Sequence, residues 1–275
     1  MRHYTLILGA FVLAASLHAQ TPVVATNGTL NAASFAVGTP VAPGSLAAIF
    51  GTALASSVAS ADTIPLSGSL GGATVTFQSS TASITAPLLF AQPDDLAAGV
   101  ASQINAQIPW ELAPAAGTTE TVNVIVTNNG IASAPSPVTI TSAAPGLFAI
   151  GTNPIVTNLD GTLVWAPNTI AGIASHAANV GDAIIIYATG LGPVDSPIAD
   201  GADSVDKLRN TVTVPTVLVG GVSATVLFSG LAPDFVGLNQ INILVPSVPA
   251  GNTVPIQIQM NGITTSNTLT IAITQ

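Results

Sequence analysis

The stretch Gly237-Leu-Asn-Gln-Ile-Asn-Ile-Leu-Val-Pro246 decides the fold, because the chain contains it twice. The other copy is Ala101-Ser-Gln-Ile-Asn-Ala-Gln-Ile-Pro109, at an offset of 137 positions (from Gln103 to Gln240). Both copies alternate polar and apolar residues and end at a proline, which has no N–H to donate to a neighbouring strand. This pattern predicts a half-buried β-strand in each copy. A duplicated strand in turn predicts a duplicated domain.

The repeat extends along most of the chain beyond this strand. Residues 44–54 match residues 181–191 at the same offset, and further pairs follow in the same order with small shifts. These pairs are Gly71-Gly72 with Gly220-Gly221, Leu89-Phe90 with Leu227-Phe228, Pro93-Asp94 with Pro233-Asp234, and Asn129-Gly130 with Asn261-Gly262. We therefore predict a first module at residues 29–142 and a second module at residues 143–275.

The spacing of apolar segments indicates the fold class. Short segments that alternate polar and apolar residues are separated by turn residues, which is typical of antiparallel β-sandwiches. Asn129-Gly130 predicts a tight hairpin turn, because Asn and Gly tolerate positive φ. Glu, Lys and Arg, which fill exposed helix faces, are nearly absent. The sequence thus predicts an all-β fold of two tandem sandwiches. The unbroken run Ile184-Ile-Ile-Tyr187 predicts a strand covered on both faces, with the first module as the second cover.

Residues 1–19 are typical of a secretory signal peptide. Arg2 and His3 precede an apolar stretch, and Leu17-His-Ala19 places a small residue before a cleavage site ahead of Gln20. The apolar stretch is short for the roughly 20 residues of a membrane-spanning helix, so we favour cleavage over an anchor. The chain has no cysteine, so its stability depends on core burial without disulfides. We predict a protein secreted to the extracellular space or the cell surface.

The composition excludes two classes of partner. The chain has 3 Lys and Arg residues against 12 Asp and Glu residues, and its formal net charge is −9 at pH 7. Without a basic patch, nucleic acids and anionic membrane surfaces are poor partners. Hydrophobic residues make up 48% of the chain, but beyond the signal peptide they lie in strand-length segments. We therefore predict no transmembrane segment in the mature chain.

Several longer motifs carry a resemblance to a known family. They are Asn31-Ala-Ala-Ser-Phe35, Val41-Ala-Pro-Gly44, Gln103-Ile-Asn-Ala-Gln-Ile-Pro-Trp-Glu111, Ala188-Thr-Gly-Leu-Gly-Pro-Val194, and the segments 224–233 and 237–242. Together they resemble the uncharacterised C-terminal domain family of Solibacter-type acidobacterial secreted proteins. The individual modules are similar to immunoglobulin-like IPT/TIG domains. The resemblance implies secretion and a pair of immunoglobulin-like sandwiches after the signal peptide. It implies no reaction, because the function of that family is unknown.

No group of residues predicts catalysis. His176 is the single histidine after the signal peptide, and no nucleophile motif accompanies it, so we interpret it as a loop histidine. For Glu111 and Glu120 we favour structural roles at strand ends over the paired-carboxylate chemistry of glycosidases. Asp94 and Asp234 follow prolines at equivalent places, which predicts turn chemistry in both. We predict that the protein is not an enzyme and uses no cofactor.

One loop offers a metal hypothesis. Asp195, Asp200, Asp203 and Asp206 lie close together in the sequence, and carboxylates are ligands that calcium accepts. Their spacing matches no EF-hand and lacks its bidentate glutamate. We therefore favour a solvated acidic loop that two basic neighbours partly neutralise. Calcium binding stays the alternative for this loop.

The aromatic residues bear on the choice between two kinds of partner. Glycan-binding sandwiches present exposed rings, whereas Trp110, Trp165 and Tyr187 lie in or beside apolar strands, where packing is favoured. We predict a non-catalytic interaction or structural protein of the cell surface or extracellular matrix, with an extracellular protein or polysaccharide as partner. The alternative is a secreted carbohydrate-binding module, and a hydrolase is the third choice. An exposed coplanar pair of aromatic rings would favour glycan binding.

Overall fold

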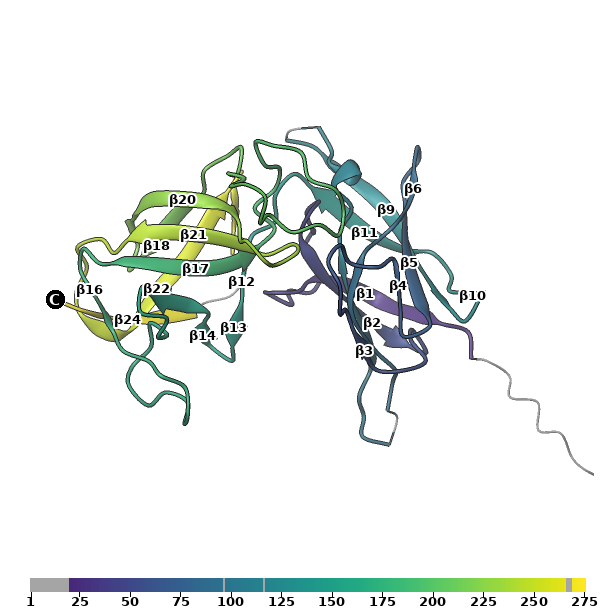
Figure 1. Ribbon diagram of the computed structural model, residues 1–275, viewed down its shortest axis with the longest axis horizontal. Helices are drawn as coiled ribbons and strands as arrows, with labels where there is room; N and C mark the ends of the chain where they lie inside the picture. The colour runs from purple at the N-terminus through teal and green to yellow at the C-terminus, as the bar shows by residue number, and fades with distance from the viewer. Residues whose placement is uncertain (1–19, 96, 116, 266–268) are drawn as a thin grey trace, which may run out of the picture.

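The computed structural model describes residues 20–275 except 96, 116 and 266–268. The predicted signal peptide, residues 1–19, lies outside the described residues. The described chain forms two β-modules that lie side by side along its longest axis (Figure 1). Among these residues the one helical segment is the single 3-10 turn η1 (Trp110–Leu112). The described part of the chain contains no helix with the length and apolar character needed to cross a bilayer.

The first module is built from two sheets. Its strands are β1 (Val23–Asn31), β2 (Leu46–Thr52), β3 (Ala59–Ser60), β4 (Ser69–Leu70), β5 (Ala73–Gln78), β6 (Ser83–Thr85), β7 (Leu88–Gln92), β8 (Ser102–Gln107), β9 (Thr119–Asn128), β10 (Ile131–Ala132) and β11 (Ser136–Thr141). One sheet has the order β1-β2-β8-β7-β3, and in the other β9 pairs with β5, β10 and β11. With β1, β2, β5, β7, β8, β9 and β11 as strands A to G, the sheets are A-B-E-D and C-F-G, the arrangement of immunoglobulin constant-type domains.

The second module repeats this arrangement. Its strands are β12 (Gly146–Leu147), β13 (Ala149–Ile150), β14 (Asn153–Pro154), β15 (Val156–Asn158), β16 (Ala178–Asn179), β17 (Ala183–Thr189), β18 (Thr216–Val219), β19 (Val222–Ser223), β20 (Thr225–Leu231), β21 (Asn239–Leu244), β22 (Gly251–Met260), β23 (Ile263–Thr264) and β24 (Leu269–Thr274). The order β12-β17-β21-β20 gives A-B-E-D, and β18-β22-β24 gives C-F-G. The predicted all-β fold of two tandem immunoglobulin-like sandwiches is confirmed.

The strand positions bear on the predicted module limits. The sheets of the first module end with β11 at Thr141, and those of the second begin with β12 at Gly146. Strand β1 begins at Val23 and pairs with β2, so the first module also includes residues before position 29. That each module folds by itself stays a prediction.

The duplicated stretch that decides the fold forms β8 and β21, the E strands of the two modules. In β8 the side chain of Gln103 donates from Nε2 to Asn105 Oδ1 at 2.7 Å. In β21 Gln240 makes the same bond to Asn242 at 2.8 Å. These amides are half-buried on the outer face, whereas the intervening isoleucines are buried. The alternation seen in the sequence therefore corresponds to the two faces of a strand.

Other details of the strands are duplicated as well. Both D strands carry a register shift before a phenylalanine, at Phe90 in β7 and at Phe228 in β20. The hairpins at Asn129-Gly130 and Asn261-Gly262 have positive φ at both residues, as predicted for the first of them. The sequence repeat thus extends to bulges and turn conformations.

Each module buries its own core. In the first module Ile49, Phe77 and Ile104 are fully buried in one cluster of apolar side chains. In the second module Ile184 and Ile256 belong to a separate cluster. Burial of one such side chain stabilises a fold by roughly 1.5–3 kcal/mol, so each module has a source of stability of its own.

The prediction that β17 is covered on both faces is wrong. Ile184 and Ile186 are fully buried, but Ile185 and Tyr187 are only half-buried. The unbroken apolar run therefore divides between the core and the outer face of the A-B-E-D sheet. The first module does not cover that face completely, because the two modules leave an open cleft beside Tyr187.

We expect residues 143–275 expressed alone to fold cooperatively, because this module has its own core. We also expect lower stability than in the full chain, since the contacts to the first module described below are lost. Urea unfolding followed by the fluorescence of the buried Trp165 tests both statements. A broad, non-cooperative transition would contradict the separate core, and a midpoint equal to that of the full chain would contradict the stabilising contact.

Candidate functional site

A buried hydroxyl connects the two modules. Thr189, the last residue of β17, is fully buried. Its Oγ1 accepts a hydrogen bond from the backbone N–H of Leu46 in the first module (2.9 Å) and donates to the carbonyl of Gly237 (2.7 Å). Because both partners are backbone groups, the bond fixes the start of β2 against the turn before β21.

A second side chain crosses the junction from the other direction. Asn31, at the end of β1, is buried and donates from Nδ2 to the carbonyl of Ala144 (2.9 Å). Gly190 lies against the same groups: a Cβ there would be 2.1 Å from Ala144 O and 3.3 Å from Asn31 Nδ2. Gly190 also has a φ of 84°. Position 190 therefore requires glycine both for its conformation and for the close approach of the Ala144 carbonyl, to which Asn31 binds.

The acidic loop between β17 and β18 docks on the first module. Asp200 Oδ1 accepts a hydrogen bond from the backbone N–H of Trp110 (2.9 Å). The next residue, Gly201, donates its N–H to Gln107 Oε1 (2.7 Å) and accepts from the N–H of Leu66 (2.8 Å). In Figure 1 this green loop lies at the junction of the two modules. This loop, the strap (residues 195–209), thus crosses the junction, a role that its composition did not predict.

Arg209 binds other residues of the same loop. Its side chain is 7% exposed, and its guanidinium donates to both carboxylate oxygens of Asp206, at 2.6 and 3.1 Å. It also donates to Ser204 Oγ and to the carbonyl of Pro197. A planar guanidinium suits such a bidentate contact, which holds the two ends of the loop together.

The four aspartates of the calcium hypothesis have different surroundings. Asp195 accepts from the N–H and Nδ2 of Asn210, Asp200 from Trp110, and Asp206 from Arg209. The side chain of Asp203 makes no hydrogen bond or ion pair with the residues that the structure describes. Within the described residues no three His, Cys, Asp or Glu side chains are grouped to hold a metal ion. Calcium binding by this loop stays a prediction.

Burial perturbs one of these carboxyls. The pKa of Asp200 is raised to about 6, mainly because the carboxyl is half-buried; the Trp110 N–H opposes the rise, and the charge and hydrogen bonding of Glu111 add to it. Glu111 lies in η1, so the two carboxyls face each other across the junction. Because the pKa in the folded state exceeds the ordinary value, Asp200 favours folding at low pH, and this contribution is lost as the pH rises through about 6.

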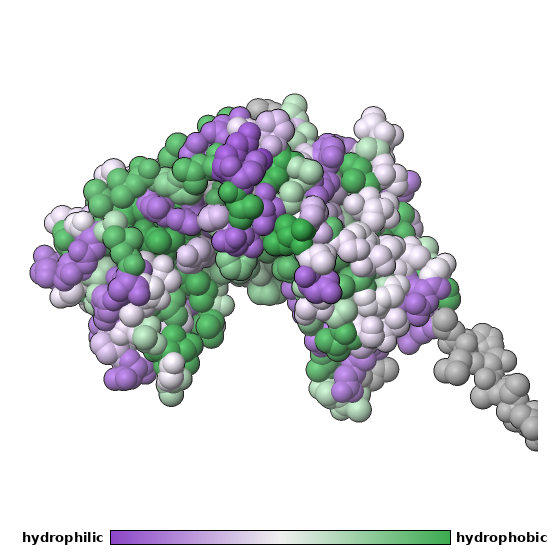
Figure 2. Space-filling model, viewed as in Figure 1, coloured by the Kyte–Doolittle hydropathy of each residue, from purple (hydrophilic) through white to green (hydrophobic). Residues whose placement is uncertain are grey.

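Beside the junction lies an open cleft of about 930 Å³. Its lining is mostly apolar and comes from both modules: Leu46, Ala61, Asp62, Thr63, Ile64, Leu66 and Leu89 from the first, and Phe148, Ile155, Tyr187, Asp234, Phe235, Val236 and Leu238 from the second. Figure 2 shows apolar green surface on both lobes and around their junction. Leu46 belongs to both features, because its N–H binds Thr189 while its side chain lines the cleft. The contacts of the junction therefore determine the shape of the cleft.

The two aspartates predicted to have the same turn role differ in the structure. Asp94 Oδ1 accepts the backbone N–H of Ala53 (2.8 Å), which is a long-range contact and not a bond within a turn. Asp234 lies in a turn before β21 with a φ of 63°, which fits the predicted turn chemistry, and it also lies in the lining of the cleft. Sequence similarity alone could not separate the two, since both follow a proline.

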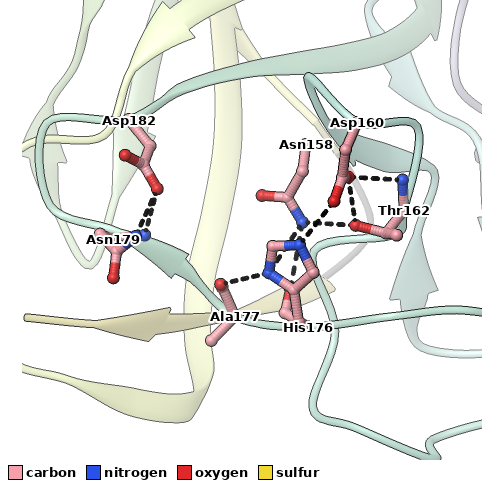
Figure 3. Close-up of polar contacts among 7 residues, drawn as sticks. All are labelled: Asn158, Asp160, Thr162, His176, Ala177, Asn179 and Asp182. Carbon is pink, nitrogen blue, oxygen red and sulfur yellow. Dashed lines mark hydrogen bonds and ion pairs between the residues drawn. The ribbon is translucent and has the colours of Figure 1, made fainter.

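His176 lies in a polar cluster at the surface of the second module (Figure 3). Its Nε2 is 3.1 Å from Asp160 Oδ2, and its Nδ1 is 2.8 Å from the carbonyl oxygen of Ala177. These two acceptors raise the pKa of His176, with the Ala177 carbonyl as the larger cause. The pKa of Asp160 falls to about 2, chiefly because the Thr162 hydroxyl donates to it. Both ring nitrogens thus already have polar partners within the second module, which favours a structural role for His176.

The two tryptophans are not exposed platforms for sugar stacking. Trp165 is 2% exposed and donates from Nε1 to the carbonyl of Pro154 (2.7 Å). The ring of Trp110 packs on Gly44, where an added Cβ would be 2.0 Å from its Cη2 atom. Among the described residues the recorded aromatic pair is Phe35 with Phe50, tilted at 52° with ring centroids 6.2 Å apart. The coplanar pair that would favour glycan binding is therefore not found in this part of the chain.

Sequence reasoning missed Thr189, Gln107 and Asn31 as junction residues. A signal existed for two of them, since Asn31 and Gln107 lie in the motifs that carry the family resemblance. Thr189 repeats Thr52 of the first module, and the repeat alone gives no reason to distinguish them. The difference appears only when the modules are assembled, because Thr52 is exposed and Thr189 is buried.

Comparisons with known proteins add little to this description. No family model matches the chain, and none of the curated proteins does. Solved structures similar to it include the titin domains Z1Z2 in complex with telethonin, at 9% identity and a TM-score of 0.20, covering 93% of this chain and 98% of that chain. Another is the C-terminal domain of the Streptococcus agalactiae AgI/II polypeptide BspA, at 11% identity and a TM-score of 0.19, covering 90% of this chain and 99% of that chain. At these TM-scores, the strand order of the chain itself carries the fold assignment.

We expect Thr189→Val to lower the free energy of unfolding by about 1–3 kcal/mol, because valine keeps the shape but leaves the Leu46 N–H without its acceptor. Chemical denaturation of the full chain measures the change. The matched control is Thr52→Val, the equivalent exposed position in the first module, which should change little. Equal effects of the two substitutions would contradict the role given to Thr189.

We expect Asp200→Asn to remove part of the pH dependence of stability. Asparagine keeps the acceptor for Trp110 but carries no charge, so it resembles the protonated aspartic acid. The melting temperature of the variant relative to the wild type should therefore be higher at pH 7.5 than at pH 4.5. A relative melting temperature that stays constant, or that changes in the opposite direction, would contradict the raised pKa.

Proposed function

We propose that the chain is a non-catalytic interaction protein, secreted or held at the cell surface, that binds an extracellular protein through the cleft between its modules. One observation carries this proposal: an apolar cleft of about 930 Å³ is built from both modules and lies beside a hydrogen-bonded junction. Concave apolar surfaces at domain interfaces are the usual place for ligands, and roughly 300–1,000 Å³ is typical of such sites.

The side chains at the edge of the cleft support the same function. Phe235 is 59% exposed and Ile64 is 46% exposed, one from each module. Large apolar side chains held in water on a concave surface mark an interaction site better than scattered exposed residues do. The bonds made by His176 favour a structural role for that residue, in line with a protein that binds and does not catalyse.

Binding of a polysaccharide is the second candidate, and one repeated feature favours it. On the outer face of the first A-B-E-D sheet, Asn105 lies opposite Phe90, and in the second module Asn242 lies opposite Phe228. Amides beside aromatic rings can bind sugars, and two equivalent faces would suit a polymer with repeating units. The tilted geometry of the recorded aromatic pair makes this the weaker candidate.

We expect a partner to be captured from the envelope or culture medium of the source organism by the immobilised wild-type protein and not by Phe235→Ser. Leu159→Ser is the matched control, because Leu159 is 73% exposed and does not line the cleft. Capture of the same proteins by Phe235→Ser would overturn the assignment of the cleft. Release of the bound material by soluble polysaccharide, with no protein retained, would favour the second candidate.

A further inference from the structure

We infer that the cleft takes a peptide segment in which large apolar side chains lie next to lysine or arginine. This inference rests on the proposed function of the cleft and adds the chemistry of the partner. It depends on three features: a carboxylate on each wall, the different use of one repeated aspartate, and the lack of a basic residue in the lining of the cleft among the residues that the structure describes.

Each wall of the cleft presents a carboxylate next to an exposed apolar side chain. The first module supplies Asp62 and, two residues later, Ile64. The second module supplies Asp234 and the adjoining Phe235. A ligand lying between the walls would therefore meet an apolar surface and a negative charge on both sides.

Comparison of the two repeats shows that Asp234 is free of the structural role of its counterpart. In the first module Asp94 satisfies the backbone N–H of Ala53. The second module has Gly190 at the position of Ala53, and Asp234 makes no hydrogen bond or ion pair through its side chain within the described residues. Asp234 has a φ of 63°, a conformation that Asp tolerates better than most residues. The same motif thus binds a distant backbone N–H in one module, and in the other it lies in a turn that lines the cleft.

The described residues supply no cation to these carboxylates. Their two basic residues are Lys207 and Arg209, neither of which lines the cleft. Arg209 is bound to Asp206. Asp62 likewise makes no ion pair within the described residues. Both carboxylates are exposed, so they are accessible to a cationic group of a ligand.

The combination of charge and apolar lining selects the class of ligand. Anionic lipids and acidic polymers are repelled by the carboxylates and by the net charge. A neutral polysaccharide would leave much of the apolar lining without apolar contacts. A peptide with adjoining apolar and basic side chains satisfies both, and its cations can also contact the ring of Tyr187 or Phe235. The opening of the cleft between two modules lets an extended chain enter and leave it.

The test uses a synthetic peptide with blocked ends, Gly-Ser-Lys-Leu-Phe-Lys-Ser-Gly, titrated into the purified full chain in a calorimeter. Two control peptides replace both lysines by glutamate, or Leu-Phe by Ser-Ser. We expect the basic apolar peptide to bind at least about tenfold more tightly than the glutamate peptide, with an affinity that falls as salt rises. The serine peptide should bind more weakly than the basic apolar peptide, because it lacks the apolar contacts.

Variants assign the binding to the cleft. The double variant Asp62→Asn, Asp234→Asn should weaken binding of the basic apolar peptide several-fold and reduce the salt dependence of its affinity. Asp203→Asn should do neither, because Asp203 does not line the cleft. Phe235→Ser should weaken binding of the same peptide at least about tenfold, as expected for loss of a buried aromatic contact, whereas Leu159→Ser should not. All of these side chains are partly or fully exposed, and melting curves confirm that each variant is folded.

The outcomes separate this inference from the proposed function. Equal affinity for the basic and glutamate peptides, with loss of both in Phe235→Ser, would overturn the inference and leave the cleft as the binding site. Binding that none of the cleft variants weakens, or no binding of the basic peptide, would also overturn the inference. The capture experiment with Phe235→Ser decides the proposed function independently.

Discussion

The buried hydroxyl of Thr189 is the contact on which the arrangement of the molecule depends. It lies between the N–H of Leu46 and the carbonyl of Gly237, so one side chain joins strands of both modules. A buried N–H without an acceptor costs about 1–3 kcal/mol, so placements of the modules that break this bond are disfavoured. Apolar contacts alone would allow the modules to slide, because the hydrophobic effect is non-directional. The hydrogen bonds of Asn31 and of the strap also join the two modules and oppose such sliding.

The two modules share the same strand order and differ in the residues at the junction between them. The E strands retain the same internal amide bond, and the same strand order is built twice. Differences are found where the modules meet: Thr189 is buried where Thr52 is exposed, and the strap has no equivalent of its length in the first module. The fold of each module depends on its own strands and core, so substitutions at the junction can create a cleft between the modules without changing that fold.

The fold could be predicted from the sequence because its signals are local. Alternation in the E strands, Asn-Gly turns and the internal repeat each determine a conformation within a few residues. The junction could not be predicted, because Thr189, Gln107 and Asp200 acquire their partners from residues far away in the chain. The acidic loop illustrates the limit. The sequence predicted that basic neighbours partly neutralise its aspartates, and Arg209 does bind Asp206. The bond from Trp110 to Asp200 could not be predicted, because it depends on how the loop folds back onto the first module.

The contacts of Thr189, Asn31 and the strap imply that the two modules form one fixed unit with the cleft between them. Residual dipolar couplings of backbone amides in a weakly aligning medium test this arrangement, because they report the orientation of each module separately. Both modules should share a single alignment tensor in the wild-type chain. Clearly different tensors for the two modules would show that they move independently and that the junction does not fix them.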